Sequence, residues 1–312
     1  MKKLLIVPFF LFLFTARLLA VDYYWVGGTG NWSELSHWVT TSGGSVGHII
    51  VPTANDNVHF DSNSFDGTGQ TVTIIAGGDA NNIVVCHNLD WTGASFNPTL
   101  TGNSNQTLRI YGSLTLISSM SYSFAGTVNF EATDLGNTIT SGGKVFQNNV
   151  VFQGTGRWKL GDDLSVNSQL TFSNGEILSV GHNISSIGFS SETSTVRHLD
   201  ITGVLLTVAG DFILNSTNFH LYAAGSLIQN NGNNSAYGIT GPSQLTFANI
   251  NGIGDCSGWR SCNVCLGNPL SIEKLTLSFS YIVVQNTVTV PVNIETLELN
   301  GTCTTEIQQG NI

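Results

Sequence analysis

The sequence predicts an all-β protein, specifically a parallel β-helix or β-solenoid, on three observations. Short β-branched and aromatic runs alternate with Gly, Asn, Ser and Asp along most of the chain, which is typical of short strands joined by tight turns. No window of eleven or more residues has the i, i+3, i+4, i+7 apolar spacing of an amphipathic helix. Phe130, Phe152 and Phe172 close similar runs at intervals of 22 and 20 residues, which indicates stacked coils of about 20–25 residues.

The composition excludes several other classes of protein. Only 10% of the 312 residues are charged, against roughly 25% in average soluble domains, while 41% are hydrophobic and 35 are Gly. Disordered chains need low hydrophobicity with high charge, coiled coils need abundant Glu and Lys, and nucleic-acid binders need basic clusters. None of these patterns is present in the sequence.

Residues 1–20 are predicted to be a secretory signal peptide. Lys2 and Lys3 precede an apolar run of eleven residues from Leu4 to Phe14, and the segment ends in Ala20, a small residue suited to cleavage. The run is too short to cross a bilayer, which needs about 20 residues. We therefore expect a secreted or extracellular protein, with association with the cell surface as one alternative. We expect no integral membrane span after cleavage of the signal peptide.

Removal of this segment makes the remaining chain more acidic. Residues 1–20 contain three of the ten basic residues and no acidic one, which leaves 7 basic against 20 acidic residues and a net charge near −13. Such a chain repels phosphate backbones, so we expect no nucleic-acid partner.

Residues 21–68 are predicted to form an aromatic-rich N-terminal cap. Trp25, Trp32 and Trp38 fall within fourteen residues and are half of the six tryptophans of the chain. One interpretation is an aromatic platform that stacks on sugar rings. The interpretation we favour is a cap that closes the open end of the β architecture with buried rings.

Residues 69–312 are predicted to form the coils, with strands of three to five residues. The triplet Leu-Thr-Phe/Leu recurs at Leu114, Leu170, Leu245 and Leu275, which we interpret as further weak self-similarity. The alternative fold is a tandem β-sandwich, which would show strand spacings of about 8–12 residues and longer alternating strands. The runs with strand character include Thr71–Ile75, Ile83–Cys86, Leu108–Tyr111, Leu114–Ile117, Val128–Phe130, Val150–Phe152, Leu164–Val166, Leu170–Phe172, Ile177–Val180, Leu199–Ile201, Val204–Val208 and Phe212–Leu214.

Residues 23–65 also carry a family resemblance. Their sequence, YYWVGGTGNWSELSHW at 23–38 and VPTANDNVHFDSNSF at 51–65, resembles the N-terminal region of large secreted adhesin-like β-solenoid proteins of Bacteroidetes-type bacteria. The resemblance implies an exported surface or matrix protein and transfers no catalytic residue. Members of that family are often much longer and end in a sorting or gliding-motility-associated domain. One hypothesis is therefore that this chain is an N-terminal fragment of a longer surface protein, truncated at its C-terminus.

An acid- and amide-rich stretch offers weak calcium ligands. Asn55, Asp56, Asp61 and Asn63 carry the hard oxygen atoms that Ca²⁺ prefers, although their spacing is not that of an EF-hand. Asp and Asn also form Asx turns without any metal. We expect no cofactor, with Ca²⁺ as the alternative.

Asp162, Asp163 and His182 are the weak candidates for catalysis. They are similar to the acidic pair and histidine of pectin-degrading β-helix hydrolases. Glycoside hydrolysis needs two carboxyl groups facing one bond, whereas adjacent residues of a strand point to opposite faces. The alternative interpretation is a turn before a strand at 164–166. We expect a protein that is not an enzyme, with a secreted polysaccharide-degrading hydrolase or lyase as the alternative.

The histidines do not form a metal-binding pattern. His182, His198 and His220 are separated by 16 and 22 residues, an interval at which a solenoid could stack them along one face. We interpret them as unrelated surface or corner residues.

Five cysteines are disulfide candidates in an exported chain. Cys262 and Cys265 form a C-x-x-C within Gly- and Asn-rich sequence, which favours a disulfide-pinned loop over a zinc or redox site. The odd number leaves one thiol unpaired within the chain, and spacing alone does not give the pairing. The candidates are Cys86, Cys256, Cys262, Cys265 and Cys303.

The function expected from the sequence is that of a non-catalytic, adhesin-like surface or matrix protein that acts through an extended solenoid surface. Its partners would be glycans or surface proteins. Rows of Asn, Ser and Thr would hydrogen-bond the partner, and Trp91, Trp158 or Trp259 would stack on sugar rings.

Overall fold

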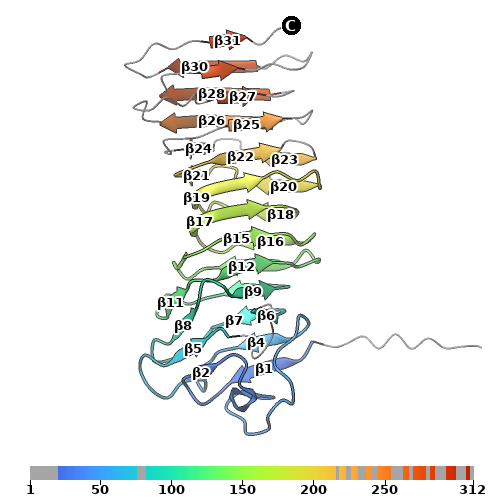
Figure 1. Cartoon of the computed structure of the whole chain (residues 1–312), viewed down its shortest axis with the longest axis vertical. Coiled ribbons are helices and arrows are strands. Elements are labelled where there is room, and N and C mark those ends of the chain that lie inside the picture. The colour runs from blue at the N-terminus through green and yellow to red at the C-terminus, as the bar shows by residue number, and fades with distance from the viewer. Residues whose placement is uncertain are drawn as a thin grey trace, which may run out of the picture.

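The computed structural model confirms the predicted fold, an all-β chain whose parallel strands stack into a solenoid (Figure 1). It describes residues 20–75, 82–215, 218–222 and 226. Beyond these it gives the backbone of strands, namely β24 (Leu227–Asn230), β25 (Tyr237–Thr240), β26 (Leu245–Ile253), β27 (Asn263–Leu266), β28 (Leu270–Ser278), β29 (Ile282–Val284), β30 (Asn293–Leu299) and β31 (Ile307–Gln309). The predicted signal peptide, except for Ala20, lies outside the described residues.

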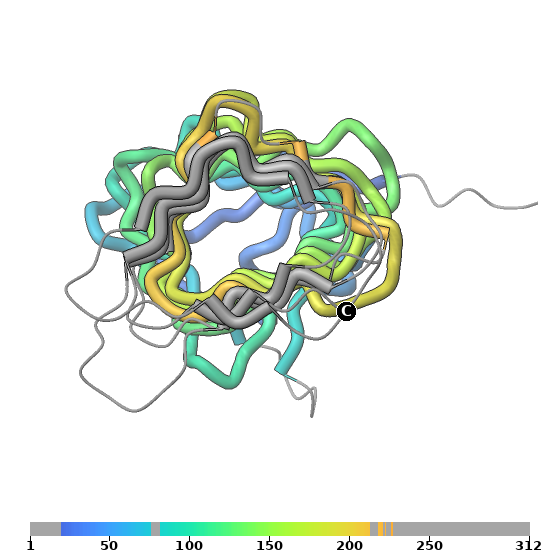
Figure 2. Tube along the Cα trace, turned by 90° about the horizontal axis from the view of Figure 1, so that it is seen from above, coloured from blue at the N-terminus to red at the C-terminus, as the bar shows by residue number. Residues whose placement is uncertain are grey.

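The coils contribute strands to three faces around one axis, and the equivalent strands of successive coils pair in parallel (Figure 2). Face 1 contains β1 (Asp22–Trp25), β4 (Asn57–His59), β7 (Leu89–Asp90), β10 (Leu114–Thr115), β13 (Asn137–Thr140), β16 (Arg157–Leu160), β18 (Gly175–Leu178), β20 (Arg197–Asp200) and β23 (Phe219–Tyr222). The tandem β-sandwich alternative is wrong, because a sandwich requires packed antiparallel sheets.

The other two faces follow face 1 in chain order. Face 2 contains β2 (Gly30–Asn31), β5 (Thr71–Thr73), β8 (Thr99–Gly102), β11 (Ser121–Phe124), β14 (Val145–Phe146), the first parts of β17 (Leu164–Phe172) and β19 (Ile184–Ser191), and β21 (Leu205–Val208). The pairing is interrupted on this face, where β2, β5, β8 and β11 form a separate sheet. Face 3 contains β6 (Ile83–Cys86), β9 (Thr107–Ile110), β12 (Thr127–Phe130), β15 (Val150–Phe152), the second parts of β17 and β19, and β22 (Phe212–Asn215).

The phenylalanine interval predicted from the sequence is confirmed as the coil repeat. Phe130, Phe152 and Phe172 are direct register partners on face 3, and the rings of Phe130 and Phe152 stack with centroids 4.9 Å apart. Each of these rings is fully buried. Burial of one such side chain stabilises the fold by about 1.5–3 kcal/mol, so the column holds coils together along the axis.

The Leu-Thr-Phe/Leu triplet, in contrast, does not mark the repeat. Leu114 and Leu245 begin triplets on face 1, Leu170 begins one on face 3, and Leu275 pairs with Ile250 on face 2. Every face buries alternate residues of its strands, so the same triplet fits any of them. The prediction that this triplet marks the coil repeat is wrong, although the repeat itself is present.

Side chains at one corner connect the first coils as a ladder. The Asn57 amide donates to an Asp22 carboxylate oxygen over 3.0 Å, and the Asn88 amide donates to Asn57 Oδ1 over 2.8 Å. The backbone N–H of Ser113 then donates to Asn88 Oδ1, and the N–H of Thr138 donates to the Ser113 hydroxyl. This is why Asn and Ser take the corners, where backbone donors would otherwise lack partners.

Helical structure is minimal. The described residues contain a single 3₁₀ turn, η1 (Leu35–His37), and none of their helices is long and apolar enough to cross a membrane.

Candidate functional site

The aromatic N-terminal segment is a buried structural unit. Trp25, Trp32 and Trp38 are each at most 1% exposed. Trp25 and Trp38 face each other across an antiparallel pairing of β1 with β3 (Trp38–Val39), and their rings meet edge to face at 4.9 Å. The platform interpretation is wrong, because rings without exposed surface cannot stack on a sugar. Their burial supports the cap interpretation.

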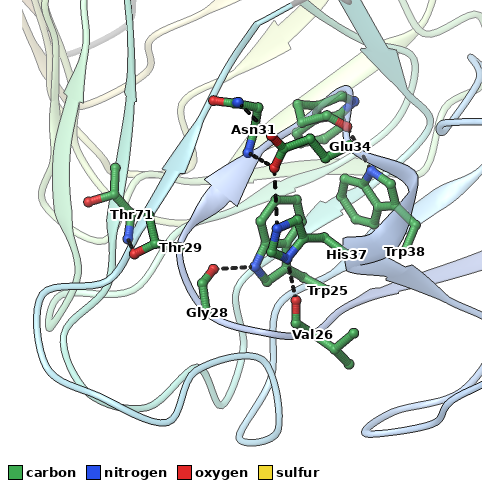
Figure 3. A network of polar contacts seen from close by, with 10 residues as sticks. Trp25, Val26, Gly28, Thr29, Asn31, Glu34, His37, Trp38 and Thr71 are labelled. Atoms are coloured by element: carbon green, nitrogen blue, oxygen red, sulfur yellow. Dashed lines mark hydrogen bonds and ion pairs between the residues drawn. The ribbon is translucent and has the colours of Figure 1, made fainter.

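Glycines shape the turn that follows β1. Gly27 and Gly28 have φ angles of +79° and +72°, which side chains disfavour, and the resulting turn brings the Gly28 carbonyl within 2.7 Å of Trp25 Nε1 (Figure 3). A Cβ on Gly30 would lie 2.0 Å from His37 Nε2. Gly30 is therefore required because the His37 ring occupies that space.

His37 is the centre of the polar network in this cap (Figure 3). Its ring stacks on Trp25 with centroids 4.3 Å apart, and its Nδ1 lies 2.6 Å from the Val26 carbonyl. Its Nε2 lies 3.3 Å from the Glu34 carboxylate, which accepts hydrogen bonds from the backbone and side chain of Asn31. The Asn31 backbone bond, followed by its side-chain bond, lowers the pKa of Glu34. The polar side chains of this motif therefore contact one another within the cap.

The calcium candidates divide into two separate turns on either side of β4. The Asp56 carboxylate is 5% exposed and accepts hydrogen bonds from the Thr53 backbone and hydroxyl, while the Asn55 backbone donates to the same hydroxyl. Asp61 accepts from the Asn63 backbone. The three residues of β4 between the two turns span about 10 Å, so the four candidates do not converge on one point. Within the described part of the chain, no three His, Cys, Asp or Glu residues form a metal-binding group.

The three catalytic candidates lie at the corner between faces 1 and 2. The Asp162 carboxylate accepts the backbone N–H groups of Ser141 and Gly143 at 2.6 and 3.2 Å. Asp163 accepts the N–H of Asn183 at 2.8 Å, and its carboxylate lies 3.8 Å from His182 Nδ1. The alternative interpretation, that the two aspartates lie in a turn before a strand, is confirmed, because β17 begins at Leu164.

These aspartates act as links between coils. Asn183, whose N–H is bound by Asp163, itself accepts the N–H of Leu205 in the next coil through its side-chain oxygen. The two carboxylates therefore point along the solenoid to different backbone donors. Both candidates of the acidic pair are already hydrogen-bonded to protein.

Two of the three histidines stack, contrary to our interpretation that they are unrelated. His198 and His220 are register partners on face 1, with ring centroids 4.6 Å apart. Desolvation, followed by repulsion from His220, lowers the pKa of His198. His182 lies in the turn after β18 and is not part of this stack.

Face 1 also carries a row of charged side chains that the sequence did not predict. His59 Nε2 lies 3.3 Å from Asp22, and His59 Nδ1 lies 3.9 Å from Asp90. Asp90 and then Asp22 raise the pKa of His59, while His59 lowers that of Asp90 and the Asn57 amide lowers that of Asp22. Register is the signal for the contact with Asp90, because His59 pairs with Asp90, whereas Asp22 lies two residues before Tyr24, the partner of His59 on β1. The long, unequal segments between these strands hide that register in the sequence.

The tryptophans proposed to stack on sugars do not reach the surface. Trp91 and Trp158 are fully buried, and the Trp91 ring stacks on Phe60 with centroids 3.9 Å apart. That prediction is wrong for both rings, because the rings fill the interior of the coils. Trp259 lies outside the described residues.

Cys86 is a free, fully buried thiol on β6, and burial raises its pKa. It faces the core opposite Ile110, so its prediction as a disulfide candidate is wrong and it behaves as a small apolar residue. Cys256, Cys262 and Cys303 lie outside the described residues, and of Cys265 only the backbone in β27 is described.

Comparison with known proteins gives no match: no protein-family model, no curated protein and no solved structure is significantly similar to this chain.

Proposed function

We propose that this chain is an exported, adhesin-like surface or matrix protein that binds its partner through the outer faces of the solenoid and catalyses no reaction. The observation that carries the proposal is the row of small hydroxyl side chains on face 2. Thr71, Thr99 and Ser121 are register partners. Successive side chains of a strand point to opposite faces, and the residues that follow the two threonines, Val72 and Leu100, are fully buried, so the threonines point outward.

A second row of the same kind continues along this face. Ser165, Ser185 and Thr207 are register partners, and the Ser185 hydroxyl donates to Ser165 Oγ over 3.1 Å. Parallel pairing places such groups about 4.8 Å apart on a rigid backbone. A rigid, uncharged row of hydrogen-bond donors and acceptors suits a long hydroxyl-rich polymer, because binding carries no entropic cost of ordering loops.

The engagement of Asp162 and Asp163 in backbone hydrogen bonds supports a non-catalytic role. Export rests on the signal-like sequence of residues 1–20. The acidic composition favours uncharged partners over anionic ones.

A glycan-array screen of the chain without residues 1–20, with and without Ca²⁺, tests the proposal. We expect binding to neutral glycans that Ca²⁺ does not alter. Failure to bind any glycan under either condition would contradict it.

A further inference from the structure

We propose a glycan-binding notch at the corner between faces 2 and 3, formed where one coil is shorter than its two neighbours; this rests on the binding function proposed above. Val166, Ser186 and Val208 are register partners before the corner, and Leu170, Phe189 and Phe212 are partners after it. Between these positions β17 has three residues, 167–169, and the following coil has three, 209–211. The coil between them has only Ile187 and Gly188.

The short corner sits back between two walls. The register shift of β17 against β19 at this point is a β-bulge, a device that proteins use to redirect side chains beside binding sites. The walls are two coils apart, about 9.6 Å, which is wide enough to admit a sugar ring. The resulting groove has a volume of about 480 Å³, within the usual range for ligand sites, and is lined by Asn167, Ser168, Gln169, Ile187, Gly188, Gly210 and Asp211.

Two glycines allow the close packing that shapes the notch. A Cβ on Gly188 would lie 2.2 Å from Gln169 Oε1, so the Gln169 amide extends over the space where a side chain would be. A Cβ on Gly210 would lie 2.9 Å from the Ile187 carbonyl oxygen. The first wall is braced from behind, because Asn149 Oδ1 accepts hydrogen bonds from the Ser168 hydroxyl and the Gln169 N–H.

The lining groups match the two surfaces of a sugar. Ile187 is 48% exposed on the floor and offers an apolar surface to the C–H face of a ring. The Asn167 amide and the Asp211 carboxylate stand on opposite walls, and within the described residues neither side chain has a protein hydrogen-bond partner. Amide and carboxylate groups are suited to hydroxyl groups, and a few placed polar groups fix a ligand's orientation.

Charge narrows the class of glycan. Asp211 is the one charged residue among those that line the notch, so it would repel a uronic acid or sulfated sugar, and none of the lining side chains is basic. The ligand class is therefore a glycan without acidic groups. Its binding would depend little on salt, unlike binding between opposite charges.

Binding of the chain without residues 1–20 to immobilised neutral polymers (a glucan, a mannan and a xylan) and acidic ones (pectate and alginate) tests the notch. The variants are the double substitution Asn167→Ala with Asp211→Ala, and Gln169→Ala. The controls are Asp134→Asn and Gln153→Ala, which change exposed side chains of the same types elsewhere on the solenoid. Circular dichroism is used to check that each variant folds.

We expect binding to at least one neutral polymer, weakened at least tenfold by the notch variants and unchanged by the controls or by added salt. Neutral-glycan binding that the notch variants leave unchanged would overturn the notch while the proposed function stands. A preference for pectate or alginate would overturn the ligand class. Absence of binding to every polymer, here and on the array, would overturn the notch and the proposed function together.

Discussion

Gly30 and His37 show how tightly single residues specify the N-terminal cap. The His37 ring is held from both sides, by stacking on Trp25 and by its contacts with Val26 and Glu34, so it cannot move to admit a side chain on Gly30. The spacing of glycine and aromatic residues in this motif therefore reflects packing.

The substitution Gly30→Ala tests this packing. A Cβ 2.0 Å from His37 Nε2 forces the ring off Trp25, and overpacking of this kind costs about 1–3 kcal/mol. Gly136→Ala is the matched control, because no atom lies within 4 Å of its Cβ position. Urea denaturation followed by circular dichroism should give a lower midpoint for Gly30→Ala alone. Equal midpoints for the two variants would contradict the packing argument.

His59 gives the cap region a pH dependence of definite sign. Its pKa is raised in the folded chain, so its contribution to stability is present below the unfolded value of about 6.5 and is lost as pH rises through the folded value. The pKa values of Asp22 and Asp90 are lowered, so their contribution is lost only when pH falls below about 4. The pairs are partly exposed, which limits the effect to less than about 1 kcal/mol.

We predict that His59→Gln lowers stability most below the ordinary histidine pKa of about 6.5 and progressively less as pH rises above it. Thermal melts of the wild type and the variant across pH 4–9 measure the difference. A difference that grows with rising pH would show that the sign, and hence the charged row, is wrong.

At the scale of elements, the corners are where polar side chains connect one coil to the next. Asp162 satisfies two backbone N–H groups of the preceding coil, at Ser141 and Gly143. The Ser141 N–H depends on this carboxylate at the corner, whereas the Gly143 N–H also donates to the Ser141 hydroxyl.

Asp162→Ala should therefore destabilise the chain by about 1–3 kcal/mol, because a charged acceptor of two hydrogen bonds is lost. Asp162→Asn keeps one oxygen and should fall between the alanine variant and the wild type. Equilibrium urea titrations at neutral pH compare the three. An unchanged midpoint for Asp162→Ala would argue that this carboxylate is free for another role.

The strands and their repeat could be predicted from the sequence, but the surroundings of individual side chains could not. Phe130, Phe152 and Phe172 revealed the repeat because the coils between them have nearly constant length. The contacts among Asp22, His59 and Asp90 could not be predicted, because loops of unequal length separate their strands. Composition alone does not say which side chains of a coil point inward, so it does not predict that Trp91 and Trp158 are buried.

At the scale of the whole molecule, the N-terminal edge of face 1 is covered. The first strand of face 1, β1, pairs with β4 on one edge and with the antiparallel β3 on the other, so its edge is not left open to pair with another chain. In the function we propose, the partner binds to the outer rows of hydroxyl groups and to the notch, away from the strand edge of face 1. The low charge noted in the sequence follows from these rows, since Ser, Thr and Asn occupy positions that Lys and Glu take on other proteins.

The central claim is that this surface binds a polymer without cleaving it. Incubation of the chain with neutral polysaccharides, with simultaneous measurement of binding and of newly formed reducing ends, tests the claim most directly. We predict binding without release of reducing ends, and the same binding by the double variant Asp162→Ala with Asp163→Ala once folding is verified. Release of reducing ends by the wild type, abolished in the double variant, would contradict the claim and identify the chain as a polysaccharide-degrading enzyme.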